Sequence, residues 1–206
     1  MFYKRLGKLP DDTILYLKQE VLKRRKKLDE VYQHIHFDYK LMEEFLEIFS
    51  NDELTISEAP AMRDLPARPV MKVFYSPVMS GFGIHKDGIR DKSALNIALS
   101  SGIEDWVRWY DDESILKLME RNVLSAVGPG GAHSRDSHLP EYENIPYLEE
   151  LRVETGDVYA VNTDIFHSFK CLGNSPRMIL QVKFKENLPI EDLVDKLSKK
   201  SFVNLI

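Results

Sequence analysis

A histidine and an aspartate two positions apart in a glycine-rich stretch have the clearest chemical potential in this sequence. His85 and Asp87 lie in the segment GFGIHKDG, residues 81–88, and a strand-like run, Ser93 to Ser100, follows them. If the segment is extended, the period of two puts both side chains on one face, about 7 Å apart along the chain. An imidazole and a carboxylate can then meet at one point, which predicts two ligands of a metal ion.

A third ligand has to come from another part of the chain. His167 lies in a second strand-like segment, and Arg177 follows it ten residues later. Two histidines and one carboxylate on one face of a metal, with positions left open, are the ligand set of non-haem Fe(II) proteins. A second pair, His36 and Asp38, lies in a stretch with helical spacing. Residues two apart on a helix point to nearly opposite sides, so we interpret that pair as surface chemistry.

These residues together resemble the motif of a known family. His85-x-Asp87, His167 and Arg177 are similar to the site residues of the Fe(II)- and 2-oxoglutarate-dependent oxygenases, whose fold is the double-stranded β-helix, or cupin-like jelly roll. The runs ALNIAL (94–99) and GDVYAVNT (156–163) support the resemblance. It covers about Val70 to Phe184 and is similar to small phage and bacterial members.

The resemblance implies a cofactor and a reaction. Fe(II) would be bound by His85, Asp87 and His167, with 2-oxoglutarate at two of the three open positions and O2 at the third. Arg177 would hold the distal carboxylate, because its guanidinium fork is bidentate and always charged. Oxidative decarboxylation of 2-oxoglutarate to succinate and CO2 would be coupled to oxidation of a substrate C–H bond. Hydroxylation is the expected outcome, and ascorbate is an expected stimulant.

Two further residues are candidates for binding the cosubstrate. Tyr75 lies ten residues before His85, and Asn96 lies in the run after Asp87. Either side chain can form hydrogen bonds to the cosubstrate, but a core tyrosine and a satisfied strand asparagine explain the same residues. Two other functions stay open: a cupin-type metal dioxygenase that uses no 2-oxoglutarate, and a catalytically inactive cupin-like binding module. The substrate, a small molecule or a peptidyl group, is not indicated.

Composition limits the class of protein. The 206 residues are 43% hydrophobic and contain no repeat, which predicts one domain with a full-sized core. A net charge of −5 argues against nucleic acid as a partner, since binding it normally requires a basic face. We interpret the basic run at residues 23–27 as the solvated side of a helix. A single cysteine, no apolar run near 18 residues and no signal-peptide pattern predict a cytoplasmic protein without membrane association.

The periodicity of apolar residues changes near residue 70. Helical spacing predicts two helices in residues 1–69, followed by a loop that wraps the domain edge; residues 185–206 are expected to form a helix and a tail. Residues 70–184 contain eight strand-like runs, which suit a two-sheet jelly roll backed by helices. The runs are Val70 to Ser76, Phe82 to Lys86, Ser93 to Ser100, Trp106 to Asp111, Leu148 to Glu154, Asp157 to Asn162, Phe166 to Cys171 and Arg177 to Phe184.

Alternation along the strands predicts which side chains face the barrel interior. In the last strand Met178, Leu180 and Val182 share the side expected to meet the helices, so Arg177 faces inward. In the third strand Leu95, Ile97 and Leu99 should cover the helix side and leave Ala94, Asn96 and Ala98 inside. A three-residue loop, 173–175, is expected to join the last two strands as a hairpin that pairs Cys171 with Arg177.

The segment from Asp112 to Pro146 is far longer than a usual strand connection. Its first part, Glu113 to Arg121, has the spacing of a short helix. Long loops in compact domains tend to be functional or disordered, so we expect a lid over the substrate or, alternatively, a surface insertion without a role. His133 and His138 lie in its glycine-rich part, which we interpret as a surface loop rather than a source of ligands.

Overall fold

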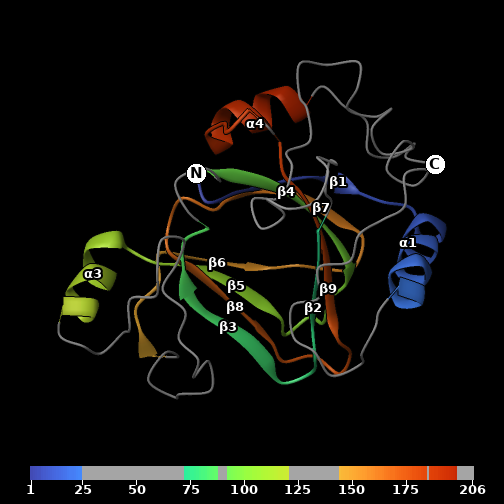
Figure 1. Ribbon diagram of the computed structural model, residues 1–206, viewed down its shortest axis with the longest axis horizontal. Coiled ribbons are helices and arrows are strands. Elements are labelled where there is room, and N and C mark those ends of the chain that lie inside the picture. Colours follow the sequence, from blue (N-terminus) through green and yellow to red (C-terminus); the bar gives the residue numbers. More distant parts are fainter. Residues whose placement is uncertain (25–71, 88–91, 121–143, 185, 199–206) are drawn as a thin grey trace, which may run out of the picture.

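Two antiparallel β-sheets face each other in the structure, a computed structural model that describes residues 1–24, 72–87, 92–120, 144–184 and 186–198 (Figure 1). The five-stranded sheet has the order β1-β7-β4-β9-β2 and the four-stranded sheet the order β3-β8-β5-β6. The strands are β1 (Tyr3–Lys8), β2 (Lys72–Ser76), β3 (Ser80–His85), β4 (Ser93–Ser100), β5 (Trp106–Trp109), β6 (Glu149–Arg152), β7 (Asp157–Asn162), β8 (His167–Cys171) and β9 (Arg177–Val182).

This architecture confirms the predicted jelly roll of the double-stranded β-helix type. Each of the eight predicted strands is present, and β4 and β7 have the predicted bounds. β1 was not predicted. It pairs with β7, where Tyr3 lies opposite Val161, and forms the edge of the larger sheet.

Helices cover the outer face of the five-stranded sheet. Apolar side chains of α1 (Asp11–Arg24) and α4 (Ile190–Leu197) pack on the side chains that alternate outward from β4 and β9. The predicted assignment of the two strand faces is therefore correct. The second predicted N-terminal helix lies outside the described residues. The outer core includes Ile14, Leu17, Val21, Leu95, Ile97, Leu99, Met178, Leu180, Val182, Phe184, Ile190, Leu193 and Leu197.

A second core fills part of the space between the sheets. Ala94, Ala98 and Ile179 of the larger sheet pack there against Val107 and Trp109 of the smaller one. The small side chains of β4 face this interior, as the alternation predicted. Because the inner faces of both sheets are apolar at this place, they pack against each other, and this cluster holds the two sheets together.

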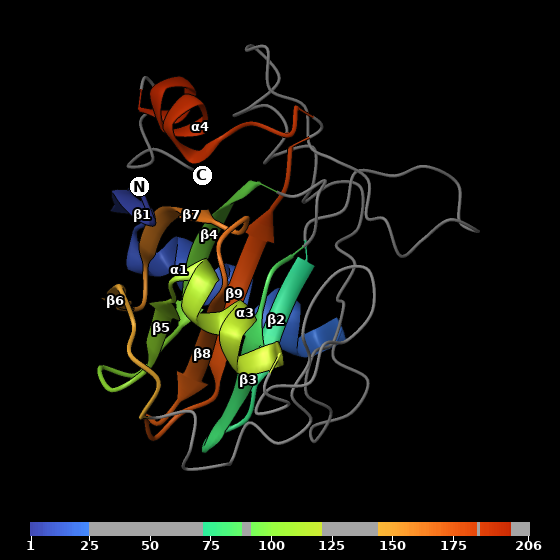
Figure 2. The same cartoon turned by 90° about the vertical axis from the view of Figure 1, so that its left-hand side faces the viewer.

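α3 (Asp112–Glu120) lies on the other side of the sheets from α1, and α4 lies at the end beside β1 (Figures 1 and 2). The fully buried Ile115 of α3 packs against Ile84, Tyr110 and Phe166. This helix corresponds to the helix predicted at Glu113 to Arg121. Residues 121–143 of the expected lid lie outside the described residues, so a lid role stays a prediction.

The predicted hairpin between the last two strands is wrong. β8 pairs with β3 and β5 in the smaller sheet, whereas β9 pairs with β4 and β2 in the larger one. The chain therefore crosses from one sheet to the other after Cys171, and Cys171 does not pair with Arg177. Arg177 still faces the interior, because the inner faces of both sheets border the same space.

None of the helices in the part of the chain that the structure describes is long and apolar enough to span a membrane.

Candidate metal centre

A β-bulge brings His85 to the interior face of β3. Phe82 pairs with Phe169 on β8, but the pairing then shifts so that His85, rather than Ile84, lies opposite His167. Strict alternation would put Phe82 and Ile84 on the same face. Because of the extra residue, Ile84 packs outward against α3 and His85 points inward like Phe82. Gly83 lies within this irregular stretch, between Phe82 and His85.

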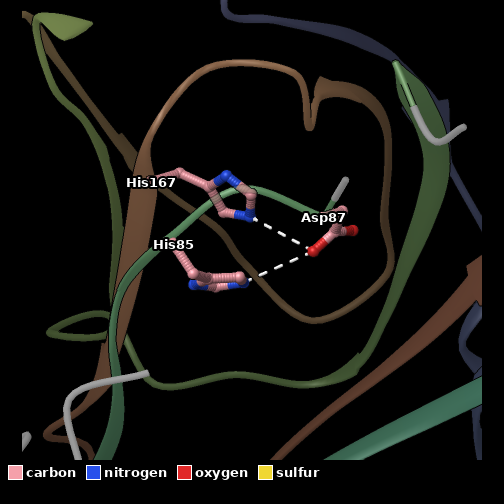
Figure 3. A group of neighbouring side chains, drawn as sticks. All are labelled: His85, Asp87 and His167. Carbon is pink, nitrogen blue, oxygen red and sulfur yellow. Dashed lines mark ion pairs between the residues drawn. The ribbon is translucent and has the colours of Figure 1, made fainter. Parts of the chain in front are cut away.

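His85, Asp87 and His167 lie together, as the sequence predicted. The two histidines point toward Asp87 from the ends of β3 and β8 (Figure 3). Asp87 Oδ1 is 3.4 Å from His85 Nε2 and 3.9 Å from His167 Nε2. The three ligand atoms lie within 4.8 Å of one another, so one ion could contact all of them. Asp87 lies beyond the end of β3, and its backbone N–H donates to the carbonyl of Thr163 beside β7.

Hydrogen bonds fix the same tautomer in both imidazoles. His85 Nδ1 lies 2.8 Å from the carbonyl oxygen of Gly83, and His167 Nδ1 lies 2.8 Å from that of Ile165. A carbonyl oxygen can only accept, so each Nδ1 carries the proton. Each neutral ring therefore keeps the lone pair on Nε2, which faces Asp87. Such a bond to the second ring nitrogen orients a histidine for metal binding.

The electrostatic environment keeps Asp87 and His167 in metal-binding protonation states. Burial lowers the pKa of His167 to about 4, helped by the neighbouring His85 and opposed by Asp87. Burial raises the pKa of Asp87, but the Lys183 ammonium and the two histidines outweigh it and hold that pKa well below its usual range. At neutral pH the site therefore offers a neutral imidazole and an ionised carboxylate, which are the forms that bind metal.

Aromatic rings connect this triad to Arg177. The ring of Phe82 meets that of His85 edge-on at 4.4 Å and stacks on Phe169 at 6.3 Å. The guanidinium of Arg177 in turn lies over the Phe169 ring, 4.6 Å from its centroid. Arg177 is only 4% exposed. A buried cation thus lies within the barrel, and the rings of Phe82 and Phe169 lie between it and His85.

Within the part of the chain that the structure describes, several buried polar atoms on the inner face of the larger sheet have no hydrogen-bond partner. The Tyr159 hydroxyl faces Arg177 and Asn96 but forms a hydrogen bond of normal geometry with neither. Tyr159, Asn96 and Gln181 lie side by side on β7, β4 and β9. An unpaired buried polar group costs about 1–3 kcal/mol, so such a cluster indicates a ligand or bound water. The atoms are Ser76 Oγ, Asn96 Oδ1, Tyr159 OH and Gln181 Oε1.

Tyr75 does not belong to this interior set. It pairs with Met178 and packs with it in the outer core beneath the helices. Residues directly opposite in a sheet share a face, so Tyr75 points away from the triad. Of the two readings of this residue, the structure supports the core tyrosine. The side chains that β2 turns inward are Phe74 and Ser76.

Three interior residues were not proposed as site residues from the sequence, although the alternation that turns Arg177 inward also places Gln181 on that face. Tyr159 and Gln181 flank Asn96 across the sheet, and Lys183 contacts Asp87. The available signal was the period of two: counting from Arg177, it reaches Gln181 and then Lys183. His36, His133 and His138 lie outside the described residues.

The fold is similar to that of HygX from Streptomyces hygroscopicus. The apo form matches with a TM-score of 0.56 at 10% identity, covering 88% of this chain and 81% of HygX. The form with nickel and 2-oxoglutarate bound matches at 0.54 and 11%, covering 87% and 80%, and the iron-bound form at 0.53 and 10%, covering 88% and 81%. No protein-family model and no curated protein matches the chain. At this level of identity the likeness establishes the fold.

Proposed function

We propose that this protein is an Fe(II)- and 2-oxoglutarate-dependent oxygenase, and that it hydroxylates its substrate. The observation that carries the proposal is the convergence of His85 Nε2, His167 Nε2 and Asp87 Oδ1 within 4.8 Å. Two histidines and one carboxylate leave three positions of an octahedral Fe(II) free. If Fe(II) is held there by the three side chains, the open positions would admit a 2-oxo acid, whose keto and carboxylate oxygens are both ligands for such an ion.

The residues around Arg177 fit the other end of 2-oxoglutarate. A distal carboxylate requires charge-assisted donors in a site closed to water, and Arg177 supplies a buried guanidinium. The buried Tyr159 hydroxyl faces it and forms no hydrogen bond of normal geometry with any residue that the structure describes. Its proton is available, because burial raises the pKa of Tyr159 above the ordinary tyrosine value. The presence of nickel and 2-oxoglutarate in a HygX structure of the same fold supports the choice of ligands.

Each residue of the chain then has a defined task. His85, Asp87 and His167 hold the ion, and the single carboxylate leaves it a net positive charge that favours an anionic cosubstrate. Arg177 orients that cosubstrate by its far end, while Phe82 and Phe169 place apolar surface between the two ends and exclude water. When bound, Fe(II) supplies the redox chemistry that couples O2 and 2-oxoglutarate to oxidation of a C–H bond.

Succinate formation is the direct test of this function. The purified protein with Fe(II), ascorbate and 2-oxoglutarate in air is expected to release succinate, slowly when no substrate is added. Asp87→Ala is expected to abolish the release. Asp164→Ala removes an exposed carboxylate in the connection between β7 and β8 and should leave the release of succinate unchanged. With a substrate found by metabolite screening, hydroxylation predicts a product heavier by one oxygen atom.

The same assay separates the two alternatives. A cupin-type dioxygenase that uses no 2-oxoglutarate would bind Fe(II) through the same residues but release no succinate under any condition. A binding module without catalysis would consume neither 2-oxoglutarate nor O2 above the rate of free Fe(II). Either result would reject our proposal.

A further inference from the structure

Lys183 is a buried cation at the metal-binding end of the barrel. It follows β9 directly and continues the inward alternation of Arg177, Ile179 and Gln181. The residue is 7% exposed, and its Nζ donates to Asp87 Oδ2 at 3.1 Å. A lysine is rarely buried unless its charge is paired, and the Asp87 carboxylate supplies an opposite charge here.

The two oxygens of Asp87 have different partners. Oδ1 faces the Nε2 atoms of both histidines, at 3.4 and 3.9 Å, whereas Oδ2 is held by Lys183. A carboxylate can bind a metal through one oxygen or through both. With Oδ2 engaged by an ammonium, Oδ1 alone is directed at the position that an ion would share with the histidines.

The number of oxygens that Asp87 donates decides how many positions stay open. Two imidazoles and one oxygen leave three of six octahedral positions, whereas a second carboxylate oxygen would leave two. A cosubstrate that binds through two atoms and an O2 molecule together need three.

We propose that Lys183 is a positioning residue that restricts Asp87 to one-oxygen metal binding and thereby keeps the third open position available. This inference rests on the proposed function, because it assumes that the triad binds a metal. A buried ion pair is weak evidence of a role in stability, since apolar replacements of similar volume are often tolerated. A role in the geometry of the ligand explains why the charge is retained in this place.

The positive charge of Lys183 decides whether its removal strengthens or weakens metal binding. The ammonium repels a divalent cation and also competes with it for the carboxylate. Lys183→Met should therefore bind Mn(II) at least as tightly as the wild type, while Asp87 turns to donate both oxygens. A lysine with a merely structural role predicts the opposite, a weaker Mn(II) site.

Mn(II) is the probe, because water-proton relaxation counts the water molecules on a bound Mn(II) ion. We expect Lys183→Met to hold one fewer metal-bound water than the wild type and to bind 2-oxoglutarate several-fold more weakly in the Mn(II) form. Lys183→Arg, which retains a cationic donor, should restore the wild-type water count. Lys86→Met is the matched control: it removes a cation adjacent in sequence to both His85 and Asp87, but its Nζ pairs with Asp112 instead.

The outcomes separate this inference from the proposed function. An unchanged water count in Lys183→Met, or loss of Mn(II) binding that Lys183→Arg does not restore, would overturn the positioning role. A wild type that binds Mn(II) but not 2-oxoglutarate would overturn the proposed function while the water count still decides the role of Lys183. A wild type that binds no Mn(II) overturns both. Circular dichroism establishes that each variant is folded, and Lys183→Ala repeats the measurement if methionine is not tolerated.

Discussion

Arg177 reaches from the larger sheet to the smaller one and lies over the ring of Phe169, with its guanidinium carbon 4.6 Å from the ring centroid. Phe169 is two residues beyond His167 on the same face of β8, opposite Val107 where His167 lies opposite Trp109. The cation is thus held at a fixed separation from the metal ligands by a single strand. Binding of 2-oxoglutarate can therefore be tested separately at Arg177, for its distal carboxylate, and at the triad, for its 2-oxo acid end.

Arg177→Met tests the end distant from the metal. The variant keeps a long apolar side chain over Phe169 but loses the guanidinium. Binding of 2-oxoglutarate to the metal-loaded protein should weaken by about 2–3 kcal/mol, the scale of a charge-assisted hydrogen bond. Calorimetric titration measures the change, and Arg152→Met, at a half-exposed arginine of β6, is the control. An unaltered titration curve would show that another residue anchors the acid.

Metal-dependent stabilisation tests the end of the site formed by His85, Asp87 and His167. An ion that binds only the folded protein stabilises it by about 2.7 kcal/mol at a concentration one hundred times its Kd. We expect Ni(II) or Mn(II) to raise the Tm of the wild type, and His85→Ala or His167→Ala to abolish the rise, since each leaves an incomplete ligand set. His36→Ala and His133→Ala should retain it. The reverse pattern would reject the assignment of the ligands.

Removal of the Asp105 carboxylate, which lies away from the candidate metal site, is expected to destabilise the protein strongly. Its carboxylate is 1% exposed and accepts hydrogen bonds from the backbone N–H groups of Gly102, Leu172 and Gly173. It therefore ties the β4–β5 connection to the crossing between β8 and β9. Asp105→Ala would leave buried N–H groups unpaired and should lower the free energy of unfolding by about 3 kcal/mol.

Urea denaturation measures this cost. Asp105→Asn keeps one acceptor oxygen and should lose less than the alanine variant, while Asp164→Ala, at an exposed aspartate, should lose little. Equal stability of Asp105→Ala and the wild type would mean that water replaces the carboxylate in this loop cluster.

The sequence predicted the strands and their faces well because a period of two is a local property. It could not predict which sheet a strand joins. The alternation of β8 and β9 turned His167 and Arg177 inward correctly, but a three-residue loop between them looked like a hairpin. The partners that decide the pairing, β3 and β4, are distant in sequence, and Asp105 reaches the crossing from a third segment.

The sequence did not predict β1, and it suggested the wrong face for Tyr75; the two failures have related reasons. β1 has exposed Lys4 and Arg5 and no clear apolar alternation, so only its pairing with β7 and the stacking of Tyr3 on Trp109 make it a strand. Tyr75 was placed by its distance from His85, although its face depends on Met178 across the sheet. The candidate metal ligands were easier to predict, because histidine and aspartate are among the few residue types that bind metals and these three residues occur in a recognisable order.

The pKa of His167 gives a prediction for the metal-free protein. This imidazole has a pKa of about 4 in the folded state, below the ordinary value of 6.5 that applies once the chain unfolds. Between these values the unfolded chain binds more protons than the folded one. Stability must therefore fall as the pH is lowered from about 6.5 toward 4, by at most about 1.4 kcal/mol per pH unit from this group.

His167→Gln removes that titration while keeping a polar side chain of similar reach. In the presence of a chelator, the free energy of unfolding of the variant should depend less steeply on pH over this range, so the wild type loses stability relative to it as the solution is acidified. Above pH 7.5 both states of the wild type carry a neutral imidazole, and the difference between the two proteins should be constant. Urea denaturation at a series of pH values measures the two curves. Parallel curves from pH 7.5 down to 4 would show that His167 is not held neutral by its burial, and would remove the electrostatic argument for its role as a ready metal ligand.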